Sequence, residues 1–299
     1  MKHLECLSLE KSFGPQKVLD KVSFSVEHGD IYGFLGPNGA GKSTTIRIIA
    51  DLIRADAGSV HIDGIAVAKK KVEALSSVGM LIEKPSFYPH LSGETNLRLL
   101  TRLMPEIEHS EIDRVLKIVD LSSAALKKVK FYSQGMKQRL GIAQAMMGHP
   151  SLIILDEPLN GLDPVSMRDM RDLIFRLRDE GKTIFLSSHL LYEVERSCNR
   201  MCIIRRGTVI REGAVRELLY DVPEYWVEFS ALNSADLEQA ARAHFDADRI
   251  RPGLHGLLIK MKQEQIPDFI NTCVSGNIRL RAASPLSTLE DYFLSIMES

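Results

Sequence analysis

The sequence predicts an α/β fold built around a mainly parallel sheet. Two short apolar runs, residues 30–35 and 152–155, have the length and composition of fully buried strands. A third strand is predicted over residues 183–188, and helical patterns lie between the three. Strands that alternate with helices along a chain form parallel sheets, because each helix returns the chain to the same end of the sheet.

The other elements of the first two thirds follow from apolar periodicity. Residues 22–26 alternate apolar and polar side chains, which predicts a half-buried strand. Apolar residues at helical spacing predict a helix from about Lys42 through Ile53, and another over 170–177 with Gly181 as its stop. The segment from residue 84 to 131 reads as helices inserted between strands, because one helical face carries Ile112, Val115, Leu116 and Val119.

The pattern starts again after about residue 219. Strands are predicted over 225–230 and 257–261, an extended stretch over 278–280, and helices over 234–243, 265–274 and 287–297. We interpret this as a small C-terminal α/β appendage of ferredoxin-like order, with Asp221 and Pro223 as a weak boundary. The predicted domains are therefore 1–219, which contains a helical subdomain at about 84–150, and 220–299.

Composition narrows the class of protein. The chain has 299 residues, 44% hydrophobic and 26% charged, which is typical of a globular protein with a packed core. A net charge of -1 gives no overall basic field, so we expect no nucleic acid partner. No stretch reaches the roughly 18–20 apolar residues that cross a bilayer, and the N-terminus lacks the core of a signal peptide. Any function at a membrane would then require a partner protein that spans it.

The four cysteines, Cys6, Cys198, Cys202 and Cys273, form no regular framework and indicate reduced thiols in a cytosolic protein. A metal site at Cys198, Cys202 and His189 is the alternative. It is disfavoured because no second ligand pair has zinc-like spacing.

The most specific motif is a glycine-rich loop between the strand at 30–35 and the next helix. Residues 36–44 read Gly-Pro-Asn-Gly-Ala-Gly-Lys-Ser-Thr and match G-x4-G-K-[ST]. Glycines let backbone N–H groups face a phosphate, and the helix start adds its positive end. Lys42 supplies a charge for the β- and γ-phosphates, and the Ser43 hydroxyl is a ligand for Mg²⁺. We expect ATP contacts throughout this loop: Gly36, Asn38, Gly39, Ala40, Gly41, Lys42, Ser43 and Thr44.

The strand at 152–155 ends in two carboxylates, Asp156 and Glu157. At the tip of a strand that neighbours a phosphate loop, Asp156 is expected to hold Mg²⁺, and Glu157 to orient or deprotonate the attacking water. Phosphoryl transfer rests mainly on positioning and charge stabilisation, so one base and one metal suffice. Two acids at a strand end are alone a weak signal, and the phosphate loop upstream makes them specific.

A third motif brings the sequence to a known family. Residues 132–139 read Tyr-Ser-Gln-Gly-Met-Lys-Gln-Arg and resemble the L-S-G-G-Q signature of the ATP-binding cassette (ABC) family, with Ser133 and Gly135 kept. The positions that depart from the signature are Tyr132, Gln134 and Met136. Ser133 is also a good N-cap for a helix running to about Met147. The resemblance covers residues 1 to about 220 and implies a P-loop NTPase cassette with a parallel core, an N-terminal antiparallel β subdomain and an inserted helical subdomain.

In this family two cassettes pair head to tail, which implies roles for further residues. Ser133 and Gly135 would contact the γ-phosphate held by the other cassette, and Asp163, in a run similar to the D-loop, would pack at the interface. His189 matches the switch histidine and would bind both Glu157 and the γ-phosphate. Phe13 stands where the family often stacks a tyrosine on adenine. A phenylalanine of the core is the alternative for Phe13.

Glu83 stands where the family usually has a glutamine whose amide oxygen binds Mg²⁺. Glu83 is predicted to be a Mg²⁺ ligand in place of that glutamine, although its negative charge weakens ATP binding unless the metal offsets the charge. Together with the Pro-x-Phe-Tyr-Pro run after it, Glu83 resembles the bacitracin-export and lantibiotic-immunity branch. A membrane partner would dock at residues 83–95, with Phe87 and Tyr88 as contacts; packing in the subdomain core is the alternative for both aromatic residues.

The resemblance implies an ATPase subunit that uses ATP and Mg²⁺ to drive transport through a separate multi-spanning permease. It would work as a pair of cassettes on the inner face of the cell membrane. Export of a drug or peptide antibiotic is the expected direction, and import is the alternative. The sequence does not identify the cargo.

Two other classes of nucleotide-binding protein are disfavoured by the sequence. A soluble ABC ATPase acting on ribosomes or DNA is disfavoured, because the chain carries neither two cassettes nor a long coiled coil. A P-loop kinase or GTPase is disfavoured by the Ser133 signature, by His189, and by the lack of an N-K-x-D motif.

Overall fold

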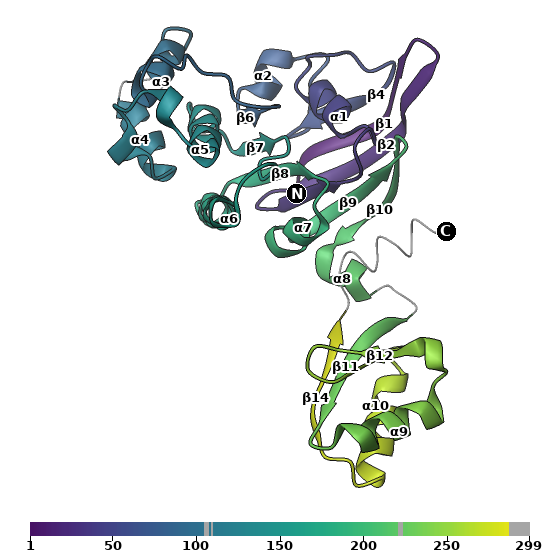
Figure 1. The fold of residues 1–299 in the computed structure, drawn as a ribbon. Helices are drawn as coiled ribbons and strands as arrows, with labels where there is room; N and C mark the ends of the chain where they lie inside the picture. The colour runs from purple at the N-terminus through teal and green to yellow at the C-terminus, as the bar shows by residue number, and fades with distance from the viewer. Residues whose placement is uncertain (105–107, 109, 221–223, 287–299) are drawn as a thin grey trace. The chain divides into compact units, whose positions relative to one another are not determined.

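The computed structural model consists of two compact units, residues 1–214 and 215–299. It describes every residue except 105–107, 109, 221–223 and 287–299, drawn in grey in Figure 1. The units divide after Ala214 rather than after residue 219, because helix α8 (Val215–Tyr220) groups with the second unit. The boundary markers Asp221 and Pro223 and the helix predicted over 287–297 lie outside the described residues.

A six-stranded sheet forms the centre of the first unit. Five of its strands are parallel, and the edge strand β10 is antiparallel to its neighbour β9. The predicted strands at 152–155 and 183–188 lie in the middle of this sheet. The order across it is β10 (Thr208–Ala214), β9 (Arg200–Arg205), β3 (Ile31–Leu35), β8 (Thr183–Ser188), β7 (Leu152–Leu155) and β6 (Val78–Leu81).

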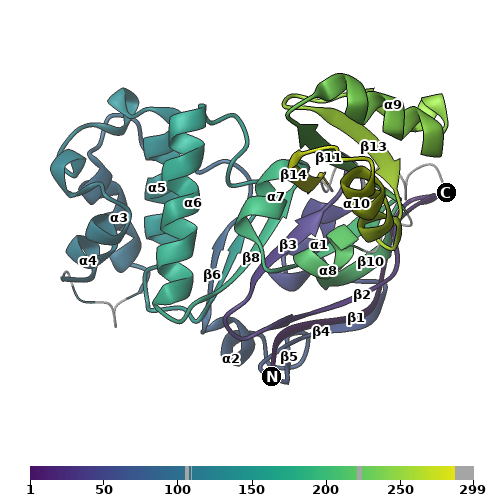
Figure 2. The same cartoon turned by 90° about the horizontal axis from the view of Figure 1, so that it is seen from below.

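A second, four-stranded sheet confirms the predicted antiparallel β subdomain. All its pairings are antiparallel. Figure 2 shows β1, β2 and β4 side by side at one end of the first unit. The order is β2 (Gln16–Glu27), β1 (Lys2–Phe13), β4 (Ala57–Ile62) and β5 (Ile65–Ala66).

The core of the first unit lies between these two sheets. Phe24 of β2 meets Phe34 of β3 and Phe185 of β8, with ring centroids 5.1 and 5.7 Å away. Helix α1 (Lys42–Ile49) adds Ile46 and Ile49 to the same buried cluster. The prediction that this helix continues through Ile53 is wrong. The chain leaves the helix after Ile49, and Asp51 takes a left-handed conformation with φ 52° as it turns toward β4.

The inserted helices gather at one end of the first unit, away from β1 and β2 (Figure 1). They are α3 (Gly93–Thr101), α4 (Ser110–Ile118) and α5 (Gln134–Ala145), with short 3-10 turns at Ser122–Ala124 and Val129–Phe131. The predicted apolar face of α4 is buried, as is Val119 just beyond it. Three more helices, α2 (Lys71–Leu75), α6 (Pro164–Asp179) and α7 (Leu191–Ser197), connect strands of the sheets. No helix among the described residues is long and apolar enough to span a membrane.

The second unit has the β-α-β-β-α-β order of a ferredoxin-like fold, which was the predicted order, although no strand was predicted at β12 (Ile250–Pro252). Its four strands form one antiparallel sheet in the order β12-β13-β11-β14. Val227, Phe229 and Phe269 anchor a separate core cluster. The elements are β11 (Tyr225–Ala231), α9 (Ser234–His244), a 3-10 turn (Ala247–Arg249), β12 (Ile250–Pro252), β13 (Leu257–Met261), α10 (Gln265–Ser275) and β14 (Leu280–Leu286).

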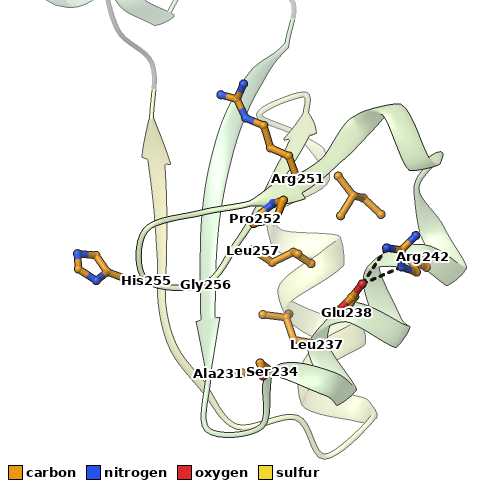
Figure 3. Close-up of a pocket in the computed structure, with 11 residues that line it drawn as sticks. Ala231, Ser234, Leu237, Glu238, Arg242, Arg251, Pro252, His255, Gly256 and Leu257 are labelled. Carbon is orange, nitrogen blue, oxygen red and sulfur yellow. Dashed lines mark hydrogen bonds and ion pairs between the residues drawn. The ribbon is translucent and has the colours of Figure 1, made fainter.

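A cavity of about 250 Å³ opens in the second unit beside α9 and the β12–β13 hairpin. Leu237 and Leu257 line it with apolar surface, and Arg242 donates to the Glu238 carboxylate at its side. Figure 3 shows this ion pair and the side chain of His255, which points away from the other lining residues. The cavity shares no residue with the phosphate site of the first unit.

Candidate functional site

The phosphate loop connects the carboxyl end of β3 to the start of α1. All five residues of β3 are buried, so the strand fixes where the loop begins. Gly41 stands at the N-cap of α1 with φ 109°, a conformation that L-residues other than glycine avoid. A Cβ at Gly36 would come within 2.4 Å of the Ile204 carbonyl oxygen, and one at Gly41 within 2.6 Å of Leu19. The two glycines therefore let the loop pack closely against Ile204 and Leu19, where any side chain would clash.

Lys42 places its ammonium group against the backbone of the phosphate loop. Its Nζ donates to the carbonyl oxygens of Gly36 at 2.6 Å and Pro37 at 3.2 Å. The same Nζ lies 3.2 Å from Oε1 of Glu157, and the Lys42 side chain is only 5% exposed. A buried ammonium needs an anionic partner, which the carboxylate provides here and a phosphate would provide in its place.

Glu157 joins the phosphate loop to the end of β8. Its Oε2 lies 2.8 Å from Nδ1 of His189, which follows β8 directly. Glu157 also has φ 49°, a left-handed conformation that is uncommon for a residue with a side chain. The structure thus brings together Lys42, Glu157 and His189, which the sequence assigned to catalysis from three distant segments.

Ser187 fixes the backbone beneath these side chains. Its hydroxyl donates to Oδ1 of Asp156 at 2.6 Å and accepts from the N–H of Glu157 at 2.9 Å. Both Ser187 and Asp156 are buried. One hydroxyl on β8 therefore sets the position of both acids at the end of β7. Ser187 was not among the predicted site residues, and its only signal in the sequence is its place in the strand that runs into His189.

A cavity of about 390 Å³ covers this constellation. Its lining contains most of the predicted phosphate-loop residues, together with Phe13 and Glu157. It also contains Gln16, Val18 and Asn160, which were not assigned to the site. Gly36 and Ala40 are buried and do not belong to the lining. Asp156 and His189 do not belong to it either, but His189 contacts the lining residue Glu157 directly, and Asp156 is connected to Glu157 through Ser187. The lining residues are Phe13, Gln16, Val18, Asn38, Gly39, Gly41, Lys42, Ser43, Thr44, Glu157 and Asn160.

Comparison with known proteins bears on this geometry. Residues 19–160 match the family model described as ABC transporter. The chain is 36% identical to the bacitracin transport ATP-binding protein BcrA of Bacillus licheniformis, over 98% of this chain and 97% of the relative. It is 38% identical to the lantibiotic transport ATP-binding protein SrtF of Streptococcus pyogenes, over 70% and 90%. The solved ADP conformation of an ATP-binding cassette of an ABC transporter matches with TM-score 0.66 and 27% identity, over 74% of this chain and 96% of that one.

The chain belongs to the ATP-binding proteins of ABC transporters. Its first unit is the cassette, and the resemblance to the bacitracin and lantibiotic branch is confirmed by relatives that bear those names.

Phe13 lies at the mouth of the cassette's cavity rather than in the core. It is 50% exposed, and the Lys11 ammonium lies 5.5 Å from the centre of its ring. The alternative of a core phenylalanine is therefore wrong. An exposed aromatic ring on the cavity wall is available for stacking on a base.

The signature helix α5 of the cassette begins as expected but lies outside the cavity lining. Ser133 is its N-cap and accepts from the N–H of Met136. Gly135 packs so closely on α6 that a Cβ would lie 2.8 Å from Oγ of Ser166. Neither residue lines the cavity of its own chain.

Asp163 is the last residue of the run predicted as the D-loop, residues 159–163, and stands at the start of α6. It caps α6 and accepts from the N–H and hydroxyl of Ser166, and these hydrogen bonds hold the pKa of its carboxyl below the usual value. Asn160, three residues before Asp163, accepts at its carbonyl oxygen from the Gln134 side chain at 3.3 Å. The signature helix and the D-loop of one cassette are thus in direct contact.

Glu83 follows β6 and is paired with Arg47 of α1. Its side chain is largely exposed, and its backbone is left-handed with φ 62°. It does not line the cavity. The Arg47 guanidinium supplies the positive charge that offsets the extra carboxylate at this position.

Asn96 of α3 fixes the shape of the segment after Glu83. Its side chain accepts from the N–H of Tyr88 at 2.8 Å and donates to the carbonyl oxygens of Tyr88 and Ser92. Tyr88 itself is 59% exposed, so its predicted alternative as a core residue is wrong, whereas Phe87 is half-buried. Residues 83–92 therefore form a loop held by Asn96, and this loop presents the Tyr88 side chain to solvent before α3 begins at Gly93.

The cysteines take no part in the site. All four are unpaired and buried, and burial raises the pKa of the Cys198 and Cys202 thiols far above their usual value. Among the described residues, neither thiol belongs to a group of potential metal ligands.

Proposed function

We propose that this chain binds and hydrolyses MgATP to drive export of a peptide antibiotic or similar drug through a separate membrane permease. The observation that carries the proposal is the contact of Glu157 with both Lys42 and His189 at the phosphate-loop cavity. The relatives named for bacitracin and lantibiotic transport support the direction and the class of cargo.

The positions of the side chains support a hydrolysis sequence. The γ-phosphate of ATP takes the place of the Glu157 carboxylate beside Lys42, because both anions suit the same buried ammonium. The released carboxylate, still held by His189, accepts a proton from a water molecule as the water oxygen attacks the γ-phosphorus. The bond from the γ-phosphorus to the bridging oxygen breaks, and ADP leaves with the electron pair.

The residues also fit Mg²⁺. Ser43 lines the cavity, and Asp156 turns one carboxylate oxygen to Ser187, which leaves the other for a cation. These hydroxyl and carboxylate oxygens are the ligands that Mg²⁺ prefers. When bound there, the ion neutralises phosphate charge. We keep Glu83 as a further proposed ligand, reached only if it leaves Arg47.

A second cassette completes the proposed site. Ser133 and Gly135 lie outside the cavity of their own chain, yet the signature helix offers a capped N-terminus suited to an anion. Head-to-tail pairing, with Asp163 at the interface, would bring them to the γ-phosphate of a partner chain. We therefore propose a dimer of cassettes that closes on MgATP and opens after hydrolysis.

The first test compares Glu157→Gln with the wild type and with Glu238→Gln, an exposed glutamate of the second unit. We expect Glu157→Gln to lose more than about a hundredfold in ATP turnover while it still binds MgATP. It should also accumulate as a dimer in MgATP by light scattering. Wild-type turnover in Glu157→Gln would overturn the catalytic assignment, and a monomer saturated with MgATP would overturn the dimer.

The transport role is tested with the same variant in cells. Glu157→Gln trapped in MgATP should co-purify with a multi-spanning membrane protein in mild detergent. Deletion of the genes for this chain and for that membrane protein should raise the sensitivity of the cells to bacitracin or to a lantibiotic. Tyr88→Ala should weaken that association and leave turnover of the isolated subunit unchanged. Recovery of ribosomes or DNA with no membrane protein would instead favour the soluble class of ABC ATPase.

A further inference from the structure

Three potential metal ligands meet in the first unit outside the ATP site. They are His3 near the start of β1, His28 just after β2, and Asp63 just after β4. One ligand atom from each lies within 4.8 Å of the others. The Asp63 carboxylate faces both rings: Oδ1 lies 2.8 Å from Nε2 of His28, and Oδ2 lies 3.6 Å from Nε2 of His3.

This cluster lies at the opposite edge of the parallel sheet from ATP. His3 contacts Thr183, the first residue of β8, and Ser151, which immediately precedes β7. The catalytic residues follow the carboxyl ends of the same strands. A six-residue strand is about 20 Å long, so the cluster and the phosphates are too far apart to share an ion.

His3 is oriented as a metal-binding histidine is. Its Nδ1 lies 2.8 Å from Oγ1 of Thr183, whose hydroxyl also accepts from the N–H of Gly29. A hydrogen bond at one ring nitrogen fixes the orientation of the ring. The other nitrogen, Nε2, would bind the metal in place of its present contact with the Ser151 hydroxyl, 3.2 Å away. The His3 side chain is 0% exposed and lies 3.6 Å from the Asp63 carboxylate, so the three candidate ligands meet at a buried imidazole.

The other two ligands lie on the solvent side and leave an entry path. His28 is 47% and Asp63 41% exposed. The rings of His3 and His28 are stacked at 3.9 Å, so His28 must turn for both lone pairs to point at one ion, and its exposure permits this. Oγ of Ser151, 3.2 Å from Nε2 of His3, or a water would supply a further oxygen.

We propose that His3, His28 and Asp63 bind a divalent transition metal of the zinc class, at a site separate from the Mg²⁺ of ATP. Two imidazoles and a carboxylate suit Zn²⁺ or Co²⁺, whereas Mg²⁺ prefers oxygen ligands alone. The ion would tie the start of β1 to the turns after β2 and β4. Backbone hydrogen bonds from Asp63 to His3 and from His28 to Met1 already hold these segments together.

The test is a calorimetric titration of the full chain with Zn²⁺, without nucleotide. We expect one Zn²⁺ per chain, a higher melting temperature on binding, and no response to Mg²⁺. Asp63→Ala and His28→Ala each should weaken Zn²⁺ binding roughly tenfold or more, because each removes a ligand. Both positions are exposed, so the variants should keep the fold, which circular dichroism checks.

Two controls separate this cluster from other histidine sites. His255→Ala, in the second unit, and Glu157→Gln, which breaks the carboxylate–histidine pair at the ATP site, should both bind Zn²⁺ like the wild type. Co²⁺ should give the visible absorption of a four-coordinate ion, and Asp63→Ala should remove it. Failure to bind one equivalent, or unchanged affinity in both ligand variants, would overturn the proposal and leave the cluster as a packing and ion-pair contact.

Discussion

Ser187 is the residue on which both acids at the end of β7 depend. Its hydroxyl binds the Asp156 carboxylate and the backbone N–H of Glu157. Ser187→Ala leaves that buried N–H without an acceptor and lets Glu157 move from its left-handed conformation. We expect kcat to fall about tenfold, equivalent to about 1.4 kcal/mol in the barrier, with little change in KM for ATP.

Ser187→Thr is the matched variant, because it keeps the hydroxyl and adds a methyl group. Its kcat should lie closer to the wild type than that of Ser187→Ala. A steady-state assay checks both. Equal losses of kcat in the two variants would show that packing, rather than the hydroxyl, matters at this position.

The Arg47–Glu83 pair lies outside the lining of the ATP cavity, but Arg47 belongs to α1, the helix that begins at the phosphate loop. Arg47→Ala leaves the Glu83 carboxylate without its counter-charge, so we expect KM for MgATP to rise about threefold, a small effect typical of an exposed pair. Glu83→Gln in the same chain should reverse the rise. Arg98→Ala, which breaks the comparable exposed pair with Glu94, is the control and should leave KM unchanged. No rise in Arg47→Ala would contradict the electrostatic role.

At the residue scale, the sequence predicts what short motifs encode. Lys42 and Ser43 follow from the spacing of glycines around them, and Glu157 from its place at a strand end. Ser187, Gln16 and Arg47 could not be predicted, because their roles come from residues that meet across the sheet or across the cavity. A serine within an apolar strand has no local feature that marks its partner on the next strand.

Glu111 links two helices of the inserted subdomain. It accepts from the Arg114 side chain on α4 and from the N–H of Gly148, just beyond α5. Burial alone would raise the pKa of its carboxyl, but the hydrogen bonds and charge of Arg114, with His149, outweigh burial and hold this pKa below the usual value. We expect Glu111→Gln to lower the free energy of unfolding by about 2 kcal/mol at pH 7.

The pH dependence of that loss has a definite sign. Because the folded pKa of Glu111 is depressed, its contribution is fully present above the pH at which free glutamate titrates, about 4.3, and is lost as pH falls through the folded pKa. Melting temperatures of the wild type and Glu111→Gln should therefore converge below about pH 4. Glu94→Gln, in an exposed helical pair, should change stability by only a few tenths of a kcal/mol at either pH. A constant gap between wild type and Glu111→Gln would contradict the ionic origin.

At the element scale, short strands with a regular pattern are easier to predict than irregular ones. β7, β8 and β13 match their predicted bounds, because each is a short apolar or alternating run between clear breaks. β1 was missed. Register shifts occur along its pairing with β2, so its buried positions do not alternate regularly and the period-2 signal is lost. The end of α1 was overextended for a similar reason: Ile53 keeps helical spacing, but it packs against the core from the loop.

The second unit has a core of its own, which gives a prediction for the whole molecule. Phe269 is almost fully buried and its ring meets Phe229 and Phe245 at centroid distances of 5.0 and 5.2 Å. Phe269→Ala should cost about 3–5 kcal/mol, most of what a unit of this size retains. In calorimetry, the melting transition of the second unit should disappear or move to a much lower temperature, while the transition of the cassette stays in place. ATP turnover should remain within about twofold of the wild type.

Val274→Ala, at an exposed position of the same helix, is the control and should leave both transitions in place. A parallel loss of ATP turnover in Phe269→Ala would contradict the independence of the two units. The alternation of strands and helices in both units could be predicted from local periodicity, although several strands, β1 and β12 among them, were not predicted. The pairing of β1 with β4, and the gathering of His3, His28 and Asp63, could not, because they depend on contacts between distant segments.

The indole of Trp226, on β11, is the only one in the chain, and Arg251 stacks over it at 3.9 Å. Intrinsic fluorescence excited at the red edge therefore comes from the second unit alone, while ATP binds in the first. Emission that shifts on addition of MgATP would report communication between the units without any label. Emission that stays constant while ATP saturates the cassette would mean that nucleotide binding does not change the surroundings of Trp226 in the second unit.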